Sequence, residues 1–249
     1  MAQLALITGA AVRIGKAIAL HLARHGFAVA IQYRGSKGEA EATVAAIRAL
    51  GVQSACFQAD LAEHAQVEDL FPAVNRSAGR VTCLINNASY FADDRIESLT
   101  EGSWDTPMAI NLKAPVFLAQ AFAAQLPAGE SGNIINIIDQ RVLRPNPHFF
   151  SYTLSKSALW TATKTMAQGL APRIRVNAIG PGPTLGSTYQ TPEDFEHECR
   201  STPLGHGTTP EEIANAVSFI LNSPAMTGQM IALDGGQHLL WQTPDIRVT

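Results

Sequence analysis

The sequence predicts an α/β domain built on a doubly wound parallel sheet of about seven strands, with helices on both faces of the sheet. Short apolar runs alternate along the 249 residues with amphipathic segments that are long enough to carry crossover helices. Most of these runs are apolar throughout rather than at every second position, which is typical of parallel strands covered on both faces. Because no repeat and no linker rich in Pro, Gly and Ser interrupts the pattern, we expect a single domain over residues 1–249.

The expected elements begin with a strand, a glycine turn and a helix. The first helix is expected over residues 16–25, where Ile18 and Leu22 recur at helical spacing and Gly26 follows as a stop signal. A long segment after the sixth strand is expected to form a flap over a site, near residues 183–205. The expected strands cover residues 4–8, 28–33, 54–59, 82–86, 133–138, 174–179 and 229–234.

The composition is that of a soluble globular protein. Apolar residues make up 46% of the chain, charged residues make up 16%, and the formal net charge is -3, which leaves no strongly basic surface for nucleic acid. We find no signal-peptide pattern and no apolar run near the roughly 20 residues of a membrane span, so we expect a cytoplasmic protein without a membrane partner. The cysteines Cys56, Cys83 and Cys199 are widely spread, and we expect them to be reduced and to bind no metal.

The stretch TGAAVRIG, residues 8–15, follows the first expected strand and has features of a phosphate-binding turn. Gly9 and Gly15 allow close approach of the backbone, and the following helix offers free N–H groups and the positive end of its dipole to a pyrophosphate. Arg13 stands where a dinucleotide-binding pattern would place another glycine. The alternative is a tight turn between strand and helix that binds no ligand.

The end of the second expected strand indicates which nicotinamide cofactor would bind. It carries Arg34, Ser36 and Lys37 where an acid would bond the adenosine ribose of NADH. A carboxylate would repel the 2′-phosphate of NADPH, whereas Arg34 can bind that phosphate through charge-assisted hydrogen bonds. NADPH is therefore favoured over NADH, the alternative being that these side chains only solvate a surface loop.

Tyr152 and Lys156 stand four residues apart in SYTLSKSALW. On a helix they share one face, so the ammonium can lie near the phenol and lower its pKa toward the working range of a general acid. Tyr33 and Lys37 have the same spacing at a strand end, where it implies no shared face. The spacing alone therefore does not identify a catalytic pair, and the expected secondary structure around each pair must be considered. Because the expected helix follows the fifth strand at the ligand-binding edge of the sheet, we expect Tyr152 and Lys156 to point into a crevice.

Six motifs in their usual order make the chain resemble the short-chain dehydrogenase/reductase family over nearly its whole length. The resemblance implies a Rossmann-type fold, an NADP(H)-dependent oxidoreductase and a homo-oligomer, usually a tetramer, formed through the helices near Asn111 and Tyr152. The motifs are TGAAVRIG (8–15), NNAS (86–89), INLKAP (110–115), SYTLSK (151–156), RVNAIGPG (175–182) and LDGG (233–236).

By matching position, the resemblance implies roles for individual residues. Tyr152 would donate the proton, Lys156 would also bind the nicotinamide ribose, and Asn111 would hold a water that links Lys156 to solvent. The alternative for Asn111 is a helix-interior amide bonded to backbone. The cofactor-binding residues would be Gly9, Arg13, Ile14, Gly15, Arg34, Ser36, Asp60, Leu61, Asn87, Ala88, Ser89, Tyr152, Lys156, Pro181, Gly182 and Thr184.

Asp139 is a departure from the family pattern, because the residue 13 positions before the tyrosine is normally a serine that donates to a substrate carbonyl. An ionised aspartate only accepts hydrogen bonds, so it would repel a ketone oxygen that gains negative charge. Reduction of a C=N bond suits it better, because the nitrogen takes up a proton and nearby N–H groups can donate to the carboxylate. If burial raises its pKa, Asp139 can relay the proton with Tyr152. The alternative is an acid that caps a helix or turn.

Arg13 and Asp139 occur together in the pteridine reductases and dihydromonapterin reductases, the branch of the family that this chain resembles. The resemblance implies reduction of a C=N bond in a pterin-like ring by NADPH, with Phe91 stacked on the ring or, alternatively, packed in the core. The other candidates are a carbonyl reductase of the same family and a dinucleotide-binding module without turnover. The substrate-binding residues would be Arg13, Ser89, Phe91, Asp139 and Tyr152.

Overall fold

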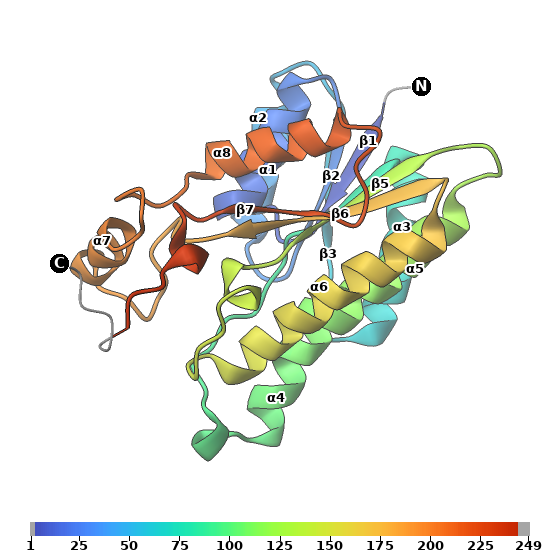
Figure 1. Ribbon diagram of the computed structural model, residues 1–249. Helices are drawn as coiled ribbons and strands as arrows, with labels where there is room; N and C mark the ends of the chain where they lie inside the picture. The colour runs from blue at the N-terminus through green and yellow to red at the C-terminus, as the bar shows by residue number, and fades with distance from the viewer. Residues whose placement is uncertain (1–2, 244–249) are drawn as a thin grey trace.

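Seven parallel strands form one sheet in the computed structural model, which describes residues 3–243 (Figure 1). The strand order is β3-β2-β1-β4-β5-β6-β7, and each hydrogen-bonded pair of neighbours is parallel. This topology confirms the predicted single-domain, doubly wound fold. The strands are β1 (Leu4–Ile7), β2 (Ala28–Tyr33), β3 (Ser54–Gln58), β4 (Cys83–Asn86), β5 (Gly132–Ile137), β6 (Ile174–Pro181) and β7 (Met230–Leu233).

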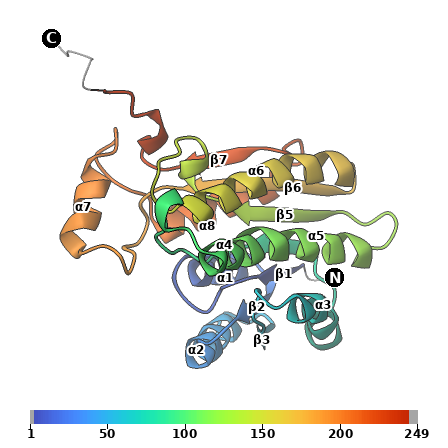
Figure 2. The same cartoon turned by 90° about the horizontal axis from the view of Figure 1, so that it is seen from below.

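Helices cover both faces of the sheet. The helices α1 (Arg13–Arg24), α2 (Lys37–Arg48) and α8 (Pro210–Leu221) lie on one face. The helices α3 (His64–Ala78), α5 (Ala114–Gln125) and α6 (Phe150–Leu170) lie on the other face, as the view from below shows (Figure 2). The shorter elements are α4 (Glu101–Pro107), a π-helical segment (Met108–Lys113), α7 (Pro192–Arg200) and the 3-10 turns Ile96–Ser98, Gln140–Val142 and Gln237–Leu239.

Burial on both faces explains the unbroken apolar strands. All residues of β1, β2 and β4 are buried. One core cluster packs Ile18 of α1 against Ile31 of β2, and a second packs Phe122 of α5 near Leu84 of β4 on the opposite face. Each fully buried side chain of this size contributes about 1.5–3 kcal/mol relative to exposure, so a polar residue in these strands would remove that contribution.

The strand predictions are confirmed within two residues, but the start of the first helix is wrong. The helix begins at Arg13 and not at residue 16, because the amide of Lys16 already donates to the carbonyl of Val12 at 3.2 Å. Arg13 therefore lies in the first turn of α1 and not in the loop before it. Its φ is +55°, the left-handed region that usually favours glycine.

The crevice of the fold lies where the strand order reverses, between β1 and β4. In open parallel sheets ligands bind at this point, beyond the carboxyl ends of the strands. The loops that follow β1, β4, β5 and β6 all meet there, because parallel strands end at the same edge. The expected flap begins after β6 and contains the helix α7, which lies to one side of the sheet (Figure 1).

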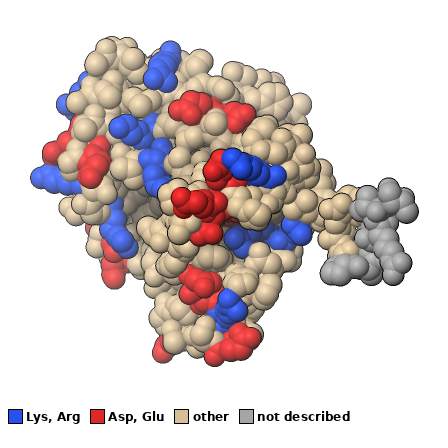
Figure 3. Space-filling view, turned by 90° about the vertical axis from the view of Figure 1, so that its left-hand side faces the viewer, with Lys and Arg blue, Asp and Glu red and all other residues tan. Residues whose placement is uncertain are grey.

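The surface of the side that carries α7 has Lys and Arg interspersed with Asp and Glu (Figure 3). Neither sign forms a continuous field on this face. Within residues 3–243, every helix is too short or too polar to span a bilayer.

Candidate active site

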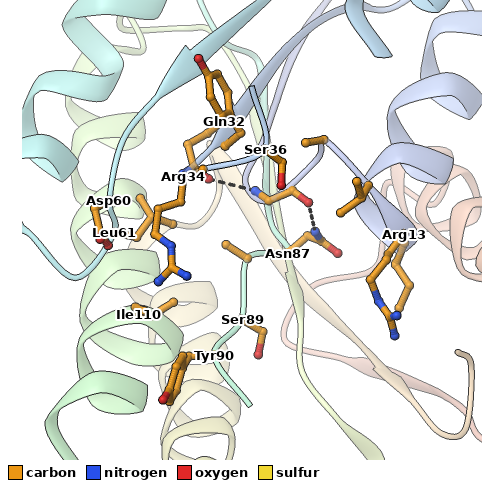
Figure 4. A pocket seen from close by; sticks show the side chains of 18 residues that line it. Arg13, Gln32, Arg34, Ser36, Asp60, Leu61, Asn87, Ser89, Tyr90 and Ile110 are labelled. Carbon is orange, nitrogen blue, oxygen red and sulfur yellow. Dashed lines mark hydrogen bonds between the residues drawn. The ribbon is translucent and has the colours of Figure 1, made fainter. Parts of the chain in front are cut away.

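Two cavities open at the carboxyl edge of the sheet. The first, which we call the β1–β4 cavity, measures about 530 Å³ and is lined by residues that follow β1, β2, β3 and β4 (Figure 4). The second, the β5–β6 cavity, measures about 380 Å³ and is lined by residues that follow β5 and β6 and by the flap. Predicted cofactor residues in the β1–β4 cavity are Gly9, Arg13, Ile14, Gly15, Arg34, Ser36, Asp60, Leu61, Asn87, Ala88 and Ser89.

The glycine turn is shaped for close contact with a ligand. Gly9 has a φ of +63°, and its amide donates to Oε1 of Gln32 at 2.9 Å. A side chain at Gly15 would collide with the carbonyl of Gly9 and with Asn87. The N-cap of α1, Val12, provides no side-chain hydrogen bond, and the first turn contains no acid. The N–H groups at this helix terminus are therefore left for an anion.

Arg13 joins the two cavities and lines both of them. Its Nη2 donates to the carbonyl oxygens of Leu185 and Gly186 in the flap, each at 3.2 Å. Holding a non-glycine residue in the left-handed region costs on the order of 1–2 kcal/mol. The guanidinium thus ties the glycine turn to the flap at the boundary between the cavities.

Arg34 and Ser36 line the β1–β4 cavity, and Arg34 lies across it from Arg13 (Figure 4). The Ser36 hydroxyl does not cap α2, although Ser36 is its N-cap residue. Lys37 pairs with Glu41 at 3.9 Å. Arg34 is therefore the cation that remains available in this part of the cavity.

Tyr152 and Asp139 meet in the β5–β6 cavity. The Tyr152 hydroxyl donates to Oδ2 of Asp139 at 2.8 Å, and Oδ1 of Asp139 accepts from the backbone N–H of Arg141 at 2.8 Å. Asp139 therefore both caps the 3-10 turn Gln140–Val142 and contacts the tyrosine, while its part in a reaction stays a prediction. Other predicted site residues in this cavity are Arg13, Ile14, Asn87, Ser89, Phe91, Lys156, Pro181, Gly182 and Thr184.

The expectation that Lys156 lowers the pKa of Tyr152 is wrong. Burial and the adjacent Asp139 carboxylate raise the pKa of Tyr152 well above its ordinary value. Lys156 Nζ instead donates to the carbonyl oxygen of Ile137 at 2.8 Å and lies 5.8 Å from the centre of the tyrosine ring. Burial raises the pKa of Asp139 and lowers the pKa of Lys156 to about 8. The phenol thus stays protonated beside an aspartate that can itself hold a proton.

Asn111 is fully buried in the π-helical segment and is not among the residues that line the two cavities. Its Oδ1 accepts from the backbone N–H of Tyr90 at 2.7 Å, and its Nδ2 donates to Oγ of Ser155 at 3.0 Å. The amide thus holds the segment after β4 against α6, next to Tyr152. A proton relay through Asn111 stays a prediction.

Phe91 lines the β5–β6 cavity, where it already has aromatic neighbours. Its ring stacks on Phe149 with centres 4.2 Å apart and an interplanar angle of 14°. It also meets Tyr152 edge to face at 4.8 Å. Phe91 is therefore a cavity wall beside the tyrosine and not a residue of the core clusters, while stacking on a ligand stays a prediction.

Sequence reasoning missed several residues of the cavities. Gln32 orients the glycine turn, and Arg141 and Phe149 line the β5–β6 cavity after Asp139. Glu198 of α7 accepts from Nε2 of Gln190 at 2.6 Å and from Nε2 of Gln237 at 3.0 Å. Arg141 follows Asp139 by two residues, so its place near the site could have been predicted from the sequence. The contact between α7 and Gln237 could not, because it joins segments that are distant in the sequence.

Comparison with known proteins identifies the family. Residues 9–238 match the family described as enoyl-(acyl carrier protein) reductase. The chain belongs to the short-chain dehydrogenase/reductase family. Among curated relatives, the 3-oxoacyl-[acyl-carrier-protein] reductase FabG of Staphylococcus epidermidis is 36% identical over 244 residues, which cover 96% of this chain and 100% of the relative.

Solved structures of the family include two of higher identity. FolM alternative dihydrofolate reductase 1 from Brucella canis, complexed with NADP, is 49% identical with a TM-score of 0.95, and the match covers 98% of this chain and 97% of that chain. The protein of the same name from Brucella suis, also in complex with NADP, is 49% identical with a TM-score of 0.95, and the match covers 98% of each chain. These neighbours fit the pterin-reducing branch that the sequence resembles.

Proposed function

We propose that this short-chain dehydrogenase/reductase uses NADPH to reduce a C=N bond of a pterin-like heterocycle, from the dihydro to the tetrahydro form. The observation that carries the proposal is the 2.8 Å hydrogen bond from the Tyr152 hydroxyl to Asp139. A carboxylate at this position accepts hydrogen bonds, so it suits a ring rich in N–H groups and opposes a carbonyl oxygen that gains negative charge.

The residues of the β1–β4 cavity fit NADPH. The uncapped N-terminus of α1 and the bare backbone at Gly9 suit the pyrophosphate. Arg34 and the free hydroxyl of Ser36 suit the adenosine 2′-phosphate. The name of each Brucella neighbour reports NADP, which supports the same choice. Asp60, Leu61, Asn87 and Ala88 line the same cavity and would contact the adenosine and the ribose groups.

NADPH supplies a hydride to the ring carbon when it is bound. Tyr152 gives its proton to the ring nitrogen, and Asp139, whose raised pKa lets the carboxylate take up a proton from solvent, restores that proton across their hydrogen bond. The raised pKa values of both groups keep the proton within the pair until the nitrogen takes it. Lys156 provides a buried positive charge at the end of β5 and would hold the nicotinamide ribose in the cavity that Pro181, Gly182 and Thr184 also line.

A carbonyl reductase is the second candidate, and the names of the FabG relatives favour it. The higher identity to the FolM neighbours and the acid at position 139 favour the pterin. A binding module without turnover has little support, because the tyrosine, lysine and aspartate are assembled in one cavity.

The substrate assignment is tested by NADPH oxidation with dihydrobiopterin, dihydromonapterin and dihydrofolate, in parallel with a 3-oxoacyl thioester, ketones and aldehydes. We expect turnover of at least one dihydropterin, with kcat/KM well above that for any carbonyl compound. Reduction of carbonyl compounds without reduction of any pterin would overturn the proposal and establish the second candidate.

Arg34→Ala is expected to raise the KM for NADPH by about tenfold or more, because a charge-assisted hydrogen bond to phosphate is lost. The KM for NADH should change much less, because NADH lacks the 2′-phosphate. Lys37→Ala is the matched comparison, since Lys37 pairs with Glu41 and should have the smaller effect. An equal loss for NADPH and NADH in Arg34→Ala would contradict the phosphate role.

The kcat/KM for NADPH is expected to fall as the pH rises through about 8, because burial lowers the pKa of Lys156 to that value. This parameter reports the free enzyme, in which the ammonium is present below that pH and is lost above it. Tyr152 does not cause the fall, because its pKa is raised and it deprotonates at higher pH. Initial rates across neutral and alkaline pH measure the profile, and a constant value well above pH 8 would contradict the role of the charge.

We also propose a cytoplasmic homotetramer, on the basis of family membership, that contacts itself through α5 and α6. Light scattering after size-exclusion chromatography measures the assembly, and a monomer at micromolar concentration would contradict it.

A further inference from the structure

Arg141 lines the β5–β6 cavity, but the proposed reaction gives its guanidinium no role. Most arginines that the structure describes donate to a carbonyl, a carboxylate or an imidazole. Arg24 and Arg76 do not, but they are exposed and line neither cavity. Arg34 is also without a partner, and it faces the expected phosphate. Among residues 3–243, Arg141 is the partly buried arginine whose guanidinium has no hydrogen-bond acceptor.

The guanidinium of Arg141 is held at the wall of the β5–β6 cavity by aromatic rings. Its Cζ lies over the ring of Phe149 at 5.0 Å from the centre, and Phe149 in turn stacks on Phe91. Phe149 has a φ of +54° and a ψ of +51°, a backbone conformation that an aromatic residue rarely adopts. Such conformations persist where the surroundings fix them and are frequent at ligand clamps. The stack therefore positions the cation before a ligand arrives.

The carboxylates that line the same cavity accept no hydrogen bond from the guanidinium of Arg141, although its charge acts on Asp139 through space. Asp139 is bonded to the Tyr152 hydroxyl and to the backbone N–H of Arg141, not to its guanidinium. Glu198 is bonded to the amides of Gln190 and Gln237. A partly buried cation without an acceptor is unfavourable, so the arrangement is completed by an anion that enters the cavity.

The position of Arg141 indicates which part of a substrate carries that anion. Arg13 lies at the boundary with the β1–β4 cavity, and Tyr152 with Asp139 marks where the ring is reduced. The guanidinium of Arg141 makes no hydrogen bond with the side chain of either reacting residue, and it lies over Phe149 in the wall of the cavity. A group that reaches it therefore extends from the ring as a substituent. A carboxylate fits best, because guanidinium and carboxylate can form two parallel hydrogen bonds.

We propose that Arg141 is a specificity-determining residue that binds a carboxylate on the substituent of the reduced ring. The inference rests on the proposed function and narrows its substrate class. The enzyme then prefers dihydropterins with an acidic substituent, such as an aryl carboxylate, over those with a short neutral substituent.

The test compares dihydropteroate, which carries an aryl carboxylate, with 6-methyl-dihydropterin, which carries none. Arg141→Met should lower kcat/KM for dihydropteroate by about tenfold or more, mainly through KM, because one charge-assisted contact is lost. The value for 6-methyl-dihydropterin, which has no carboxylate, should fall by a clearly smaller factor, because only the effect of the Arg141 charge on Asp139 and Tyr152 is lost. Arg141→Lys should fall between Arg141→Met and the unchanged protein. Arg76→Met removes an exposed cation on α3 and should alter neither substrate.

Equal losses for the two substrates, or an unchanged preference in Arg141→Met, would overturn the proposal. An unchanged KM for NADPH shows that Arg141→Met is folded. A second measurement is calorimetric binding of pteroate to the protein with NADP, which Arg141→Met should weaken by the same factor. If the unchanged protein reduces neither pterin, the proposed function fails. Binding of pteroate then still decides the role of Arg141, because no binding, or binding that Arg141→Met leaves intact, would overturn it.

Discussion

Tyr152→Phe is expected to lower kcat for the preferred substrate by about 10²–10⁴-fold, the range that a positioned general acid provides. The phenol is 6% exposed, and its hydroxyl is the donor that faces the Asp139 carboxylate. Removal of that one oxygen leaves the aromatic ring beside Phe91 and Lys156, so the fold and the cofactor cavity should persist. Single-turnover oxidation of NADPH, followed by absorbance, measures the loss at the chemical step.

Tyr33→Phe is the matched control, because Tyr33 also precedes a lysine by four residues. Tyr33 ends β2 and its spacing to Lys37 crosses from a strand into α2, so its hydroxyl is remote from Asp139. Tyr33 lines the β1–β4 cavity and not the cavity of Asp139, so we expect kcat at saturating NADPH to stay within about threefold. A Tyr152→Phe enzyme that retains its kcat would exclude the phenol as the proton donor.

Asp139→Ser is expected to lower kcat/KM for the pterin by about 100-fold, comparable to the loss of one preorganised hydrogen-bonding group. Serine cannot hold the proton that the raised pKa of Asp139 allows, and it cannot accept as two carboxylate oxygens do. Its hydroxyl can donate to a carbonyl oxygen, so activity on ketones should rise as activity on the pterin falls. Parallel assays of a dihydropterin and a ketone measure both changes.

Serine is a more informative replacement for Asp139 than a residue that cannot cap the turn, because serine preserves the local structure. Asp139 caps the 3-10 turn Gln140–Val142, and serine is also a favoured capping residue. A loss of pterin reduction therefore reports chemistry and not a collapsed turn. Pterin turnover that survives in Asp139→Ser would contradict the part assigned to the carboxylate, and Tm measurements would show whether the fold was kept.

The sheet was predictable because its signal is local. Each strand is a short apolar run, and burial on both faces makes the run continuous, so the bounds of β2 match the expected 28–33 and the other strands differ by at most two residues. The start of α1 was not predictable, because the amide of Lys16 bonds the carbonyl of Val12 although Arg13 has a left-handed backbone. Because residues 8–15 resemble a glycine turn, we expected the helix to begin after Gly15, whereas it begins at Arg13.

The site was predictable where the family pattern fixes a position and not where distant segments meet. Asp139 stands 13 residues before Tyr152, where the family normally has a serine, and this position indicated that the two residues act together; in the structure the Tyr152 hydroxyl donates to Asp139. The direction of the tyrosine pKa was wrong, because it depends on burial and on Asp139 as a neighbour rather than on the nearby lysine. Arg141 without a hydrogen-bond acceptor, and Glu198 bonded by Gln190 and Gln237 in the same cavity, are features of the fold that no local pattern reveals.

The hydrogen bonds of Glu198 hold together segments that shape the substrate cavity but carry none of the reacting residues. They link the flap, α7 and the turn at Gln237, none of which contributes the reacting tyrosine, lysine or aspartate. Substitutions in these segments can reshape the wall of the β5–β6 cavity while β5 and α6 keep Asp139, Tyr152 and Lys156 in place. One catalytic scaffold can in this way diverge toward differently substituted rings by changes confined to the C-terminal quarter of the chain.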